Sequence, residues 1–184
     1  MVWTTAPWTL PANLAIAVHP REKYVEVKDG DIGYWVAEEL SESLSSNFDF
    51  KKPVFGKSKT GEEISGWKTQ HPFIDRESPI LTADYVTMES GTGCVHIAPG
   101  HGLDDYLTGI ENGLEVYCPL TDYGTYLDDG MIPSALVGVS VLEKSTGCPA
   151  NDSVLEILES KNALLAKQSH NNAYPDYWRS KTPV

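Results

Sequence analysis

The sequence is poor in cysteine and has no long run of apolar residues. Its three cysteines are Cys94, Cys118 and Cys148, and an odd number at wide spacing indicates reduced thiols rather than a disulfide framework or a zinc cluster. No apolar stretch reaches the length of about eighteen residues needed to span a bilayer, and no basic segment precedes a long apolar one near the start. We therefore expect a cytoplasmic protein without a membrane partner.

Positive charge is scarce as well. The chain has 14 Lys and Arg against 26 Asp and Glu, for a formal net charge of −12. Because phosphate contacts need clustered cations, this balance argues against a free-standing nucleic-acid binder. The phosphate-loop, G-x-S-x-G and G-x-G-x-x-G patterns are also absent, which removes the best support for nucleotide hydrolysis and lipase-like chemistry.

Composition and pattern predict one domain over residues 1–184. The chain is 41% hydrophobic without repeats or low-complexity segments. Alternation and turn residues predict strands at 15–18, 24–28, 32–36, 53–55, 79–81 and 94–97, and helices at 38–46, 102–112 and 153–161. Asp29-Gly30-Asp31 is typical of a hairpin turn, so we expect the first three strands to form a meander. The predicted fold class is α+β and β-rich, with a barrel-like sheet and surrounding helices.

One candidate site lies near the N-terminus, in the segment Trp3-Thr4-Thr5-Ala6-Pro7-Trp8-Thr9-Leu10-Pro11-Ala12-Asn13. Its prolines stiffen the backbone, threonine hydroxyls can position an ester or a water, and an indole can stack on a base. Composition alone nevertheless favours an edge strand with aromatic core residues and turn prolines.

A second candidate site is the segment Ser90-Gly91-Thr92-Gly93-Cys94-Val95-His96-Ile97-Ala98-Pro99-Gly100-His101-Gly102-Leu103-Asp104-Asp105-Tyr106. On the predicted strand, Cys94 and His96 point to the same face, and Gly100-His101-Gly102 then turns the chain into a helix. Asp104 and Asp105 fall in the first helical turn, where the helix dipole favours carboxylates. Since each residue is rotated by about 100°, only one of them can face a pocket beside His96. A structural histidine with capping aspartates fits equally well.

The second segment also contains side chains for two other chemistries. His96, His101 and Asp105 are a candidate metal set that would activate water, although the His-x4-His spacing with two glycines matches no strong zinc signature. Cys94 and His96 are a candidate nucleophile and base, although side chains two residues apart on a strand project in parallel and rarely meet in line.

In this order, the two segments resemble the editing insertion of class I isoleucyl-tRNA synthetases. The pattern of that family is W-T-T-T-P-W-T-L-P-x-N, then G-T-G-x-V-H-x-A-P-G-H-G-x-D-D-Y, which match residues 3–13 and 91–106. His71-Pro72-Phe73 and residues 174–183 extend the resemblance over nearly the whole chain. The related valyl and leucyl insertions carry T-T-R-P in place of Thr4-Thr5-Ala6-Pro7, which favours the isoleucyl branch. We therefore expect an excised fragment of a larger synthetase.

Two departures from the family pattern affect what can be inherited. Ala6 replaces the third threonine, so a hydroxyl that would orient substrate or water is missing. Asn172-Ala173 stands where the family often has His-Ser. The H-I-G-H and K-M-S-K-S signatures of aminoacylation are absent, so we expect no amino-acid activation by this chain.

The resemblance implies a catalytic set, namely Thr4, Thr5, His96 and Asp105. It also implies a substrate-binding set, namely Trp8, His96, Gly100, His101 and Asp105. By the resemblance, Asp105 would hold the α-ammonium of the substrate, and Thr4 and Thr5 would line the ester and the attacking water. Trp8 would contact the terminal adenosine, while His96 and neighbouring backbone would shape the amino-acid pocket.

The function implied is hydrolysis of valine from mischarged isoleucine tRNA, with valyl-adenylate as a further candidate substrate. A missing methylene provides only about 1–3 kcal/mol of discrimination, for which isoleucyl-tRNA synthetases are the standard example, so a second size sieve is needed. We expect no cofactor or metal, a monomer, and two partners: the tRNA 3′ end and the rest of the synthetase. The alternatives are a non-catalytic tRNA-end-binding module and a metal-dependent hydrolase using His96, His101 and Asp105.

Overall fold

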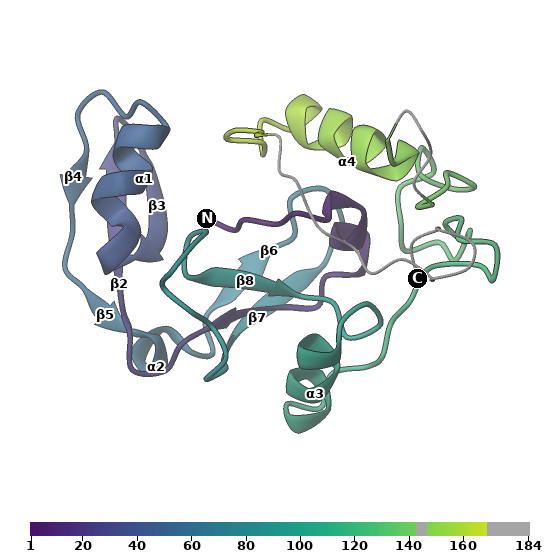
Figure 1. The fold of residues 1–184 in the computed structure, drawn as a ribbon, viewed down its shortest axis with the longest axis horizontal. Helices are drawn as coiled ribbons and strands as arrows, with labels where there is room; N and C mark the ends of the chain where they lie inside the picture. Colours follow the sequence, from purple (N-terminus) through teal and green to yellow (C-terminus); the bar gives the residue numbers. More distant parts are fainter. Residues whose placement is uncertain (143–146, 169–184) are drawn as a thin grey trace, which may run out of the picture.

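The strands of this protein divide between two four-stranded sheets with helices packed around them (Figure 1). The computed structural model describes residues 1–142 and 147–168, so the segments 172–173 and 174–183 lie outside the described residues. The predicted β-rich α+β class is confirmed. Over the two described ranges, none of the helices has the length and apolar content needed to cross a bilayer.

The first sheet has the strand order β6-β7-β1-β8. Its strands are β6 (Lys68–Gln70), β7 (Glu77–Thr82), β1 (Ala15–Val18) and β8 (Cys94–Ile97). β1 pairs in parallel with β7 and antiparallel with β8, so that Ile16 lies opposite His96. Val95 and Ile97 of β8 pack with Ala15 and Ala17 on one face, which leaves His96 on the other.

The second sheet is built on the predicted hairpin. Its strands are β3 (Ile32–Ala37), β2 (Lys23–Asp29), β4 (Val54–Phe55) and β5 (Lys59–Thr60), and both β4 and β5 pair with β2. Gly30 has φ of 63° at the hairpin turn, a conformation that glycine adopts without a Cβ clash. η2 (Glu38–Leu40) and α1 (Ser41–Asn47) follow, and Leu44 packs on the strands.

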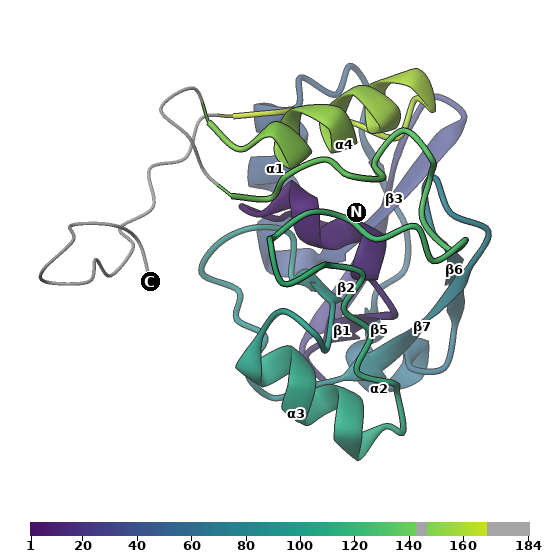
Figure 2. The ribbon, with the colours of Figure 1, turned by 90° about the vertical axis from the view of Figure 1, so that its right-hand side faces the viewer.

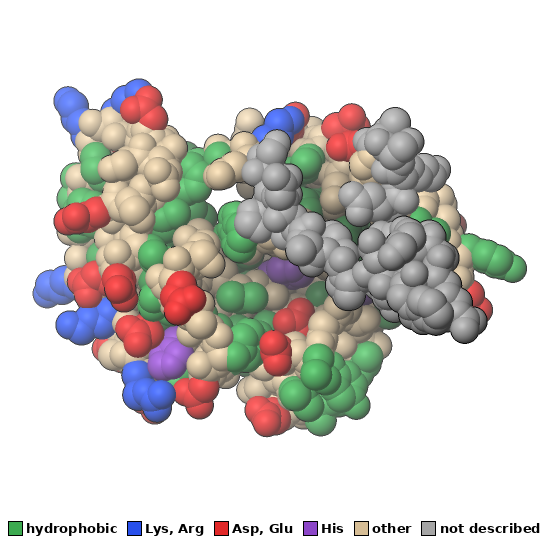
Figure 3. Space-filling view, viewed as in Figure 1, with side chains coloured by type: hydrophobic (Ala, Val, Ile, Leu, Met, Phe, Trp, Pro, Cys, Tyr) green, Lys and Arg blue, Asp and Glu red, His purple; other side chains and the backbone are tan. Residues whose placement is uncertain are grey.

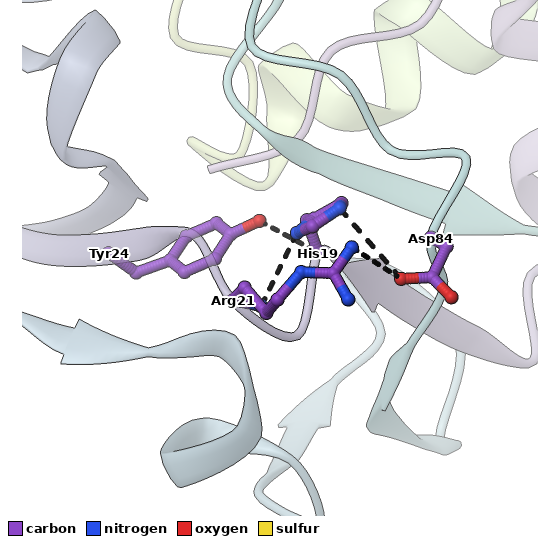
Figure 4. Close-up of polar contacts among 4 residues, drawn as sticks. All are labelled: His19, Arg21, Tyr24 and Asp84. Atoms are coloured by element: carbon purple, nitrogen blue, oxygen red, sulfur yellow. Dashed lines mark hydrogen bonds and ion pairs between the residues drawn. The ribbon is translucent and has the colours of Figure 1, made fainter.

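The predicted meander is wrong, because β1 and β2 belong to different sheets. The chain turns between them, where the backbone N–H of His19 donates to the Tyr24 hydroxyl at 2.8 Å and that hydroxyl donates to the Gly93 carbonyl at 2.8 Å. Figure 4 shows the side chains of His19 and Arg21 converging on Asp84 beside this turn. The Arg21–Asp84 ion pair is solvated and contributes little to the stability of the fold. Tyr24, fully buried, fixes the change of sheet.

Residues 3–13 do not form the edge strand that composition favoured. They contain instead the 3-10 helix η1 (Pro7–Ala12), since Pro7 suits a helix start and Pro11 lacks the N–H that a strand ladder would need. The short elements β5, β6 and α2 (Gly61–Ile64) were not predicted. A capping box between Thr60 and Glu63 begins α2.

Two longer helices lie at opposite ends of the molecule (Figure 2). α4 (Pro149–Ser160) packs beside η1 and buries Ala150, Val154 and Leu158. α3 (Leu103–Glu111) follows β8 directly and buries only Thr108 and Gly109. Both were predicted, α4 with a start four residues too late and α3 within one residue at each end.

Candidate functional site

A hydrogen bond joins the two candidate segments. Thr9 Oγ1, on η1, lies 3.0 Å from His96 Nε2, on β8. The same hydroxyl donates its only hydrogen to the Ala6 carbonyl at 2.8 Å, so His96 must donate from Nε2. This geometry assigns the tautomer of His96: Nε2 carries the hydrogen and Nδ1 is a bare acceptor.

His96 is buried without a partner for that acceptor. Its side chain is 8% exposed, and Nδ1 is the buried side-chain atom that lacks a hydrogen-bond partner in the described part of the chain. Burial, with smaller contributions from His101 and His71, lowers the pKa of His96 to about 4. The ring is therefore neutral at physiological pH, and its free acceptor is unusual because buried polar atoms normally find partners.

Asp105 and Asp104 point in different directions, as the helical rotation requires. Asp105 Oδ2 accepts from the backbone N–H of Ala98 at 2.9 Å, two residues after His96. Burial raises the pKa of Asp105, and the Ala98 bond partly opposes that shift. Asp104 is exposed. The structure thus sets Asp105, and not Asp104, against the end of β8.

The turn between β8 and α3 brings His101 to the first segment. The rings of Trp8 and His101 meet edge to face, with centroids 5.0 Å apart, and burial lowers the pKa of His101. Gly100 has a packing reason of its own, because a Cβ there would lie 2.4 Å from the Tyr117 carbonyl oxygen. The predicted substrate-binding residues therefore gather around the meeting point of η1 and β8.

The two threonines differ in their surroundings. Thr4 is half-buried and its Oγ1 accepts from the Ala6 N–H at 3.1 Å, whereas Thr5 is exposed. Since Ala6 also provides the carbonyl that Thr9 bonds, its backbone is fixed through both polar groups. Among the described residues, no hydrogen bond connects Thr4 or Thr5 with His96 or Asp105.

The loop between β6 and β7 holds η1 in place through hydrogen bonds. Local sequence patterns did not predict this contact. His71 Nε2 lies 2.9 Å from the Leu10 carbonyl while its Nδ1 accepts backbone N–H groups of Phe73 and Ile74. Arg76 donates to the carbonyls of Pro11 and Asn13. The only earlier signal was the short resemblance at residues 71–73. Unlike His96, His71 has both ring nitrogens satisfied and is structural.

A second brace comes from the C-terminal half. The Trp8 N–H donates to Asn151 Oδ1 of α4 at 3.0 Å, and the Tyr126 hydroxyl donates to the Trp8 carbonyl. These long-range contacts also could not be anticipated, because nothing in the local sequence links residue 8 with residues 126 and 151.

The two other chemistries find no geometric support. Within residues 1–142 and 147–168, no group of three or more His, Cys, Asp or Glu is arranged to hold a metal ion. The candidate set of His96, His101 and Asp105 therefore does not form a metal site in this structure. Cys94 is buried, its thiol faces the Trp35 carbonyl, and burial raises its pKa. His96 bonds Thr9 instead, so Cys94 lacks the activation that a nucleophilic thiolate requires.

Comparison with known families assigns the class of protein. The profile of a family described as "Leucyl-tRNA synthetase, editing domain" matches residues 2–125, which include the whole of both candidate segments. The chain belongs to this family of synthetase editing domains.

Two of its sequence relatives are isoleucine–tRNA ligases. It is 46% identical to the isoleucine–tRNA ligase of Nitratidesulfovibrio vulgaris and 44% identical to that of Synechococcus sp., in both cases over 100% of this chain. The predicted relation to isoleucyl-tRNA synthetase editing domains is confirmed. The chain spans about a fifth of these relatives, 19% and 18% of their lengths.

A solved structure supports the fold. The crystal structure described as GlLeuRS-CP1 superposes with a TM-score of 0.52 at 17% identity, covering 86% of this chain and 61% of that one. At this identity the likeness shows a shared fold alone.

Proposed function

We propose that this domain carries out post-transfer editing by hydrolysing the ester of valine mischarged onto isoleucine tRNA. The observation that carries the proposal is the Thr9–His96 hydrogen bond, which joins the two family segments and leaves a neutral acceptor free beside them. Asp105 is bonded to Ala98, two residues from His96, and so supplies a carboxylate nearby. Relatives named isoleucine–tRNA ligases support isoleucine tRNA as the carrier.

In the proposed reaction, water adds to the ester carbonyl and the bond to the ribose oxygen breaks. Valine leaves as its carboxylate. Of the two hydrogens of the water, one ends on the ribose oxygen and the other is released to solvent as a proton. Asp105 binds the α-ammonium by a charge-assisted hydrogen bond, which orients the ester and rejects acyl groups without an amine. Thr4 and Thr5 position the ester and the water, and Trp8 contacts the terminal adenosine.

His96 acts in this scheme by position rather than by taking a proton. With a pKa of about 4 it is a weak base at neutral pH, but its Nδ1 can accept a hydrogen bond from water or the ribose hydroxyl. An aminoacyl ester is already activated, so orientation and donors to the developing oxyanion suffice. The buried ring of His96 also limits the room for the extra methylene of isoleucine.

The decisive experiment incubates the purified chain with Val-tRNA and Ile-tRNA of the isoleucine type and follows ester loss. We expect loss of valine and retention of isoleucine, unaffected by a metal chelator. Because the net charge is −12, tRNA binding by the chain alone should be weak and should weaken further with salt. Chelator-sensitive activity, or equal loss of both amino acids, would contradict the proposal.

A second candidate function is a non-catalytic module that binds the tRNA end. Ala6 favours it, because the family hydroxyl at this position is absent. The same assay separates the two, since a binding module would protect Val-tRNA without consuming it.

A further inference from the structure

Helix α3 turns large apolar side chains toward solvent. Leu103 is 73% exposed, Leu107 51%, Ile110 53% and Tyr106 42%. Their spacing of three and four residues places them in one stripe, here called the α3 apolar face. In Figure 3 hydrophobic side chains gather over the position of α3, at the lower edge of the molecule.

The inward side of α3 consists of small residues. Thr108 and Gly109 are buried, and a Cβ at Gly109 would lie 2.8 Å from the ring of Pro99, so the helix packs closely on the proline that follows β8. An ordinary surface helix buries its large apolar residues and exposes its polar ones. α3 instead exposes its large apolar residues beside its exposed carboxylates, and a contiguous exposed apolar patch marks an interaction surface.

The charge around the α3 apolar face restricts what can cover it. The sequence contains no lysine or arginine between Arg76 and Lys144, and exposed carboxylates of Asp104, Glu111 and Glu115 border the face. RNA would meet uncompensated carboxylates. A second copy of this chain would place two acidic rims together, in chains that each have a net charge of −12.

We propose that the α3 apolar face docks on another part of the same synthetase chain, a segment with an apolar surface bordered by Lys or Arg. The relatives continue for about four fifths of their length outside the matched region, since this chain covers only 19% of them. The docked segment would hold α3 against β8 and so fix the helix that carries Asp105. The inference rests on family membership and not on the proposed ester hydrolysis.

The test uses the full-length synthetase with a photo-crosslinking residue in place of Leu107. We expect a crosslink within one chain, to a peptide outside residues 1–184. A crosslink to a second copy, to tRNA or to residues 169–184, or none at all, would overturn the proposal.

Hydrogen exchange of the full-length enzyme provides an independent measurement. Leu107→Glu should speed exchange of the α3 amides by about 10–100-fold, the ratio equivalent to exposing one buried leucine. The matched control is Val54→Glu, at a 63% exposed apolar residue on β4, which should leave α3 unchanged. Amides of β8 should keep their rates in both variants. Equal α3 exchange in Leu107→Glu and the parent enzyme would contradict docking, whatever the deacylation assay gives.

Discussion

The helices α3 and α4 have similar amphipathic patterns but use them in opposite directions. α4 places Val154 and Leu158 in the core against η1, whereas α3 exposes Leu107 and Ile110. The hydrophobic pattern of a helix therefore identifies an apolar face without saying whether the domain itself covers that face. Here α4 stabilises the first candidate segment. α3, at the other end of the molecule, provides the carboxylate of Asp105 and the exposed α3 apolar face.

The largest expected effect separates Asp105 from Asp104 on α3. Loss of one member of a buried charge pair costs about 2–5 kcal/mol, so Asp105→Ala should lower Val-tRNA deacylation by about 30-fold to 4,000-fold. Asp104→Ala, at an exposed carboxylate, should keep most of the activity. Steady-state deacylation by the two variants measures the difference directly, and an inactive Asp104→Ala would refute the assignment.

Asp105→Asn is the control for folding. In Asp105→Ala the buried N–H of Ala98 loses its acceptor, which costs about 1–3 kcal/mol of stability. The asparagine Oδ1 can still accept that hydrogen but carries no charge. We expect near-parental urea stability together with lost activity.

The second prediction compares matched leucines on the two helices. Leu158 of α4 is 6% exposed and Leu107 of α3 is 51% exposed. In the 184-residue chain, Leu158→Ala should cost about 2–5 kcal/mol of unfolding free energy, and Leu107→Ala less than about 0.5 kcal/mol. Urea unfolding of both variants tests the comparison. Similar losses would mean that α3 is covered within the domain.

The third prediction concerns the pH dependence of stability, through His96 on β8. His96 has its pKa lowered to about 4 in the folded chain, against about 6.5 when unfolded. Between these values the unfolded chain binds the extra proton, so stability is present above pH 6.5 and falls as the pH drops toward 4. About 2 kcal/mol should be lost between pH 7 and pH 5 through this residue.

His96→Gln isolates that contribution. His71 and His101 also have lowered pKa values, and Asp105 has a raised one that acts in the opposite direction, but all three remain in the variant. The parent chain should therefore lose more stability than His96→Gln between pH 7 and pH 5 in parallel urea titrations. The same loss in both proteins would be inconsistent with a buried neutral His96.

The smallest expected effect is at Ala6, on the segment that α4 stabilises. Its backbone N–H and carbonyl are already bonded to Thr4 and Thr9, so Ala6→Thr should add a hydroxyl without moving η1. We expect Val-tRNA deacylation to rise by a few-fold, about the contribution of one neutral hydrogen bond. Unchanged activity would indicate that this chain does not use a hydroxyl at position 6.

The sequence predicted β1, β8 and α3 to within a residue of their observed bounds, where glycine, proline or aspartate marks the neighbouring turns. It did not predict which strands pair, because the turn at His19 depends on Tyr24, whose hydroxyl donates to the carbonyl of Gly93, 69 residues further along the chain. Helical rotation alone predicted that only one of Asp104 and Asp105 can face the end of β8. The tautomer of His96 could not be predicted, because it is set by a threonine 87 residues away.

The two braces on η1 have a consequence for the order of assembly during synthesis. Trp8 is made before Asn151, and its backbone N–H waits for this hydrogen-bond acceptor, which lies 143 residues later. At translation rates of about 5–20 residues per second, that interval is roughly 7–30 s. The segment that contains Trp8 is therefore synthesised long before it can adopt its final structure. Nascent chains stopped before α4 should present a site that is not yet formed.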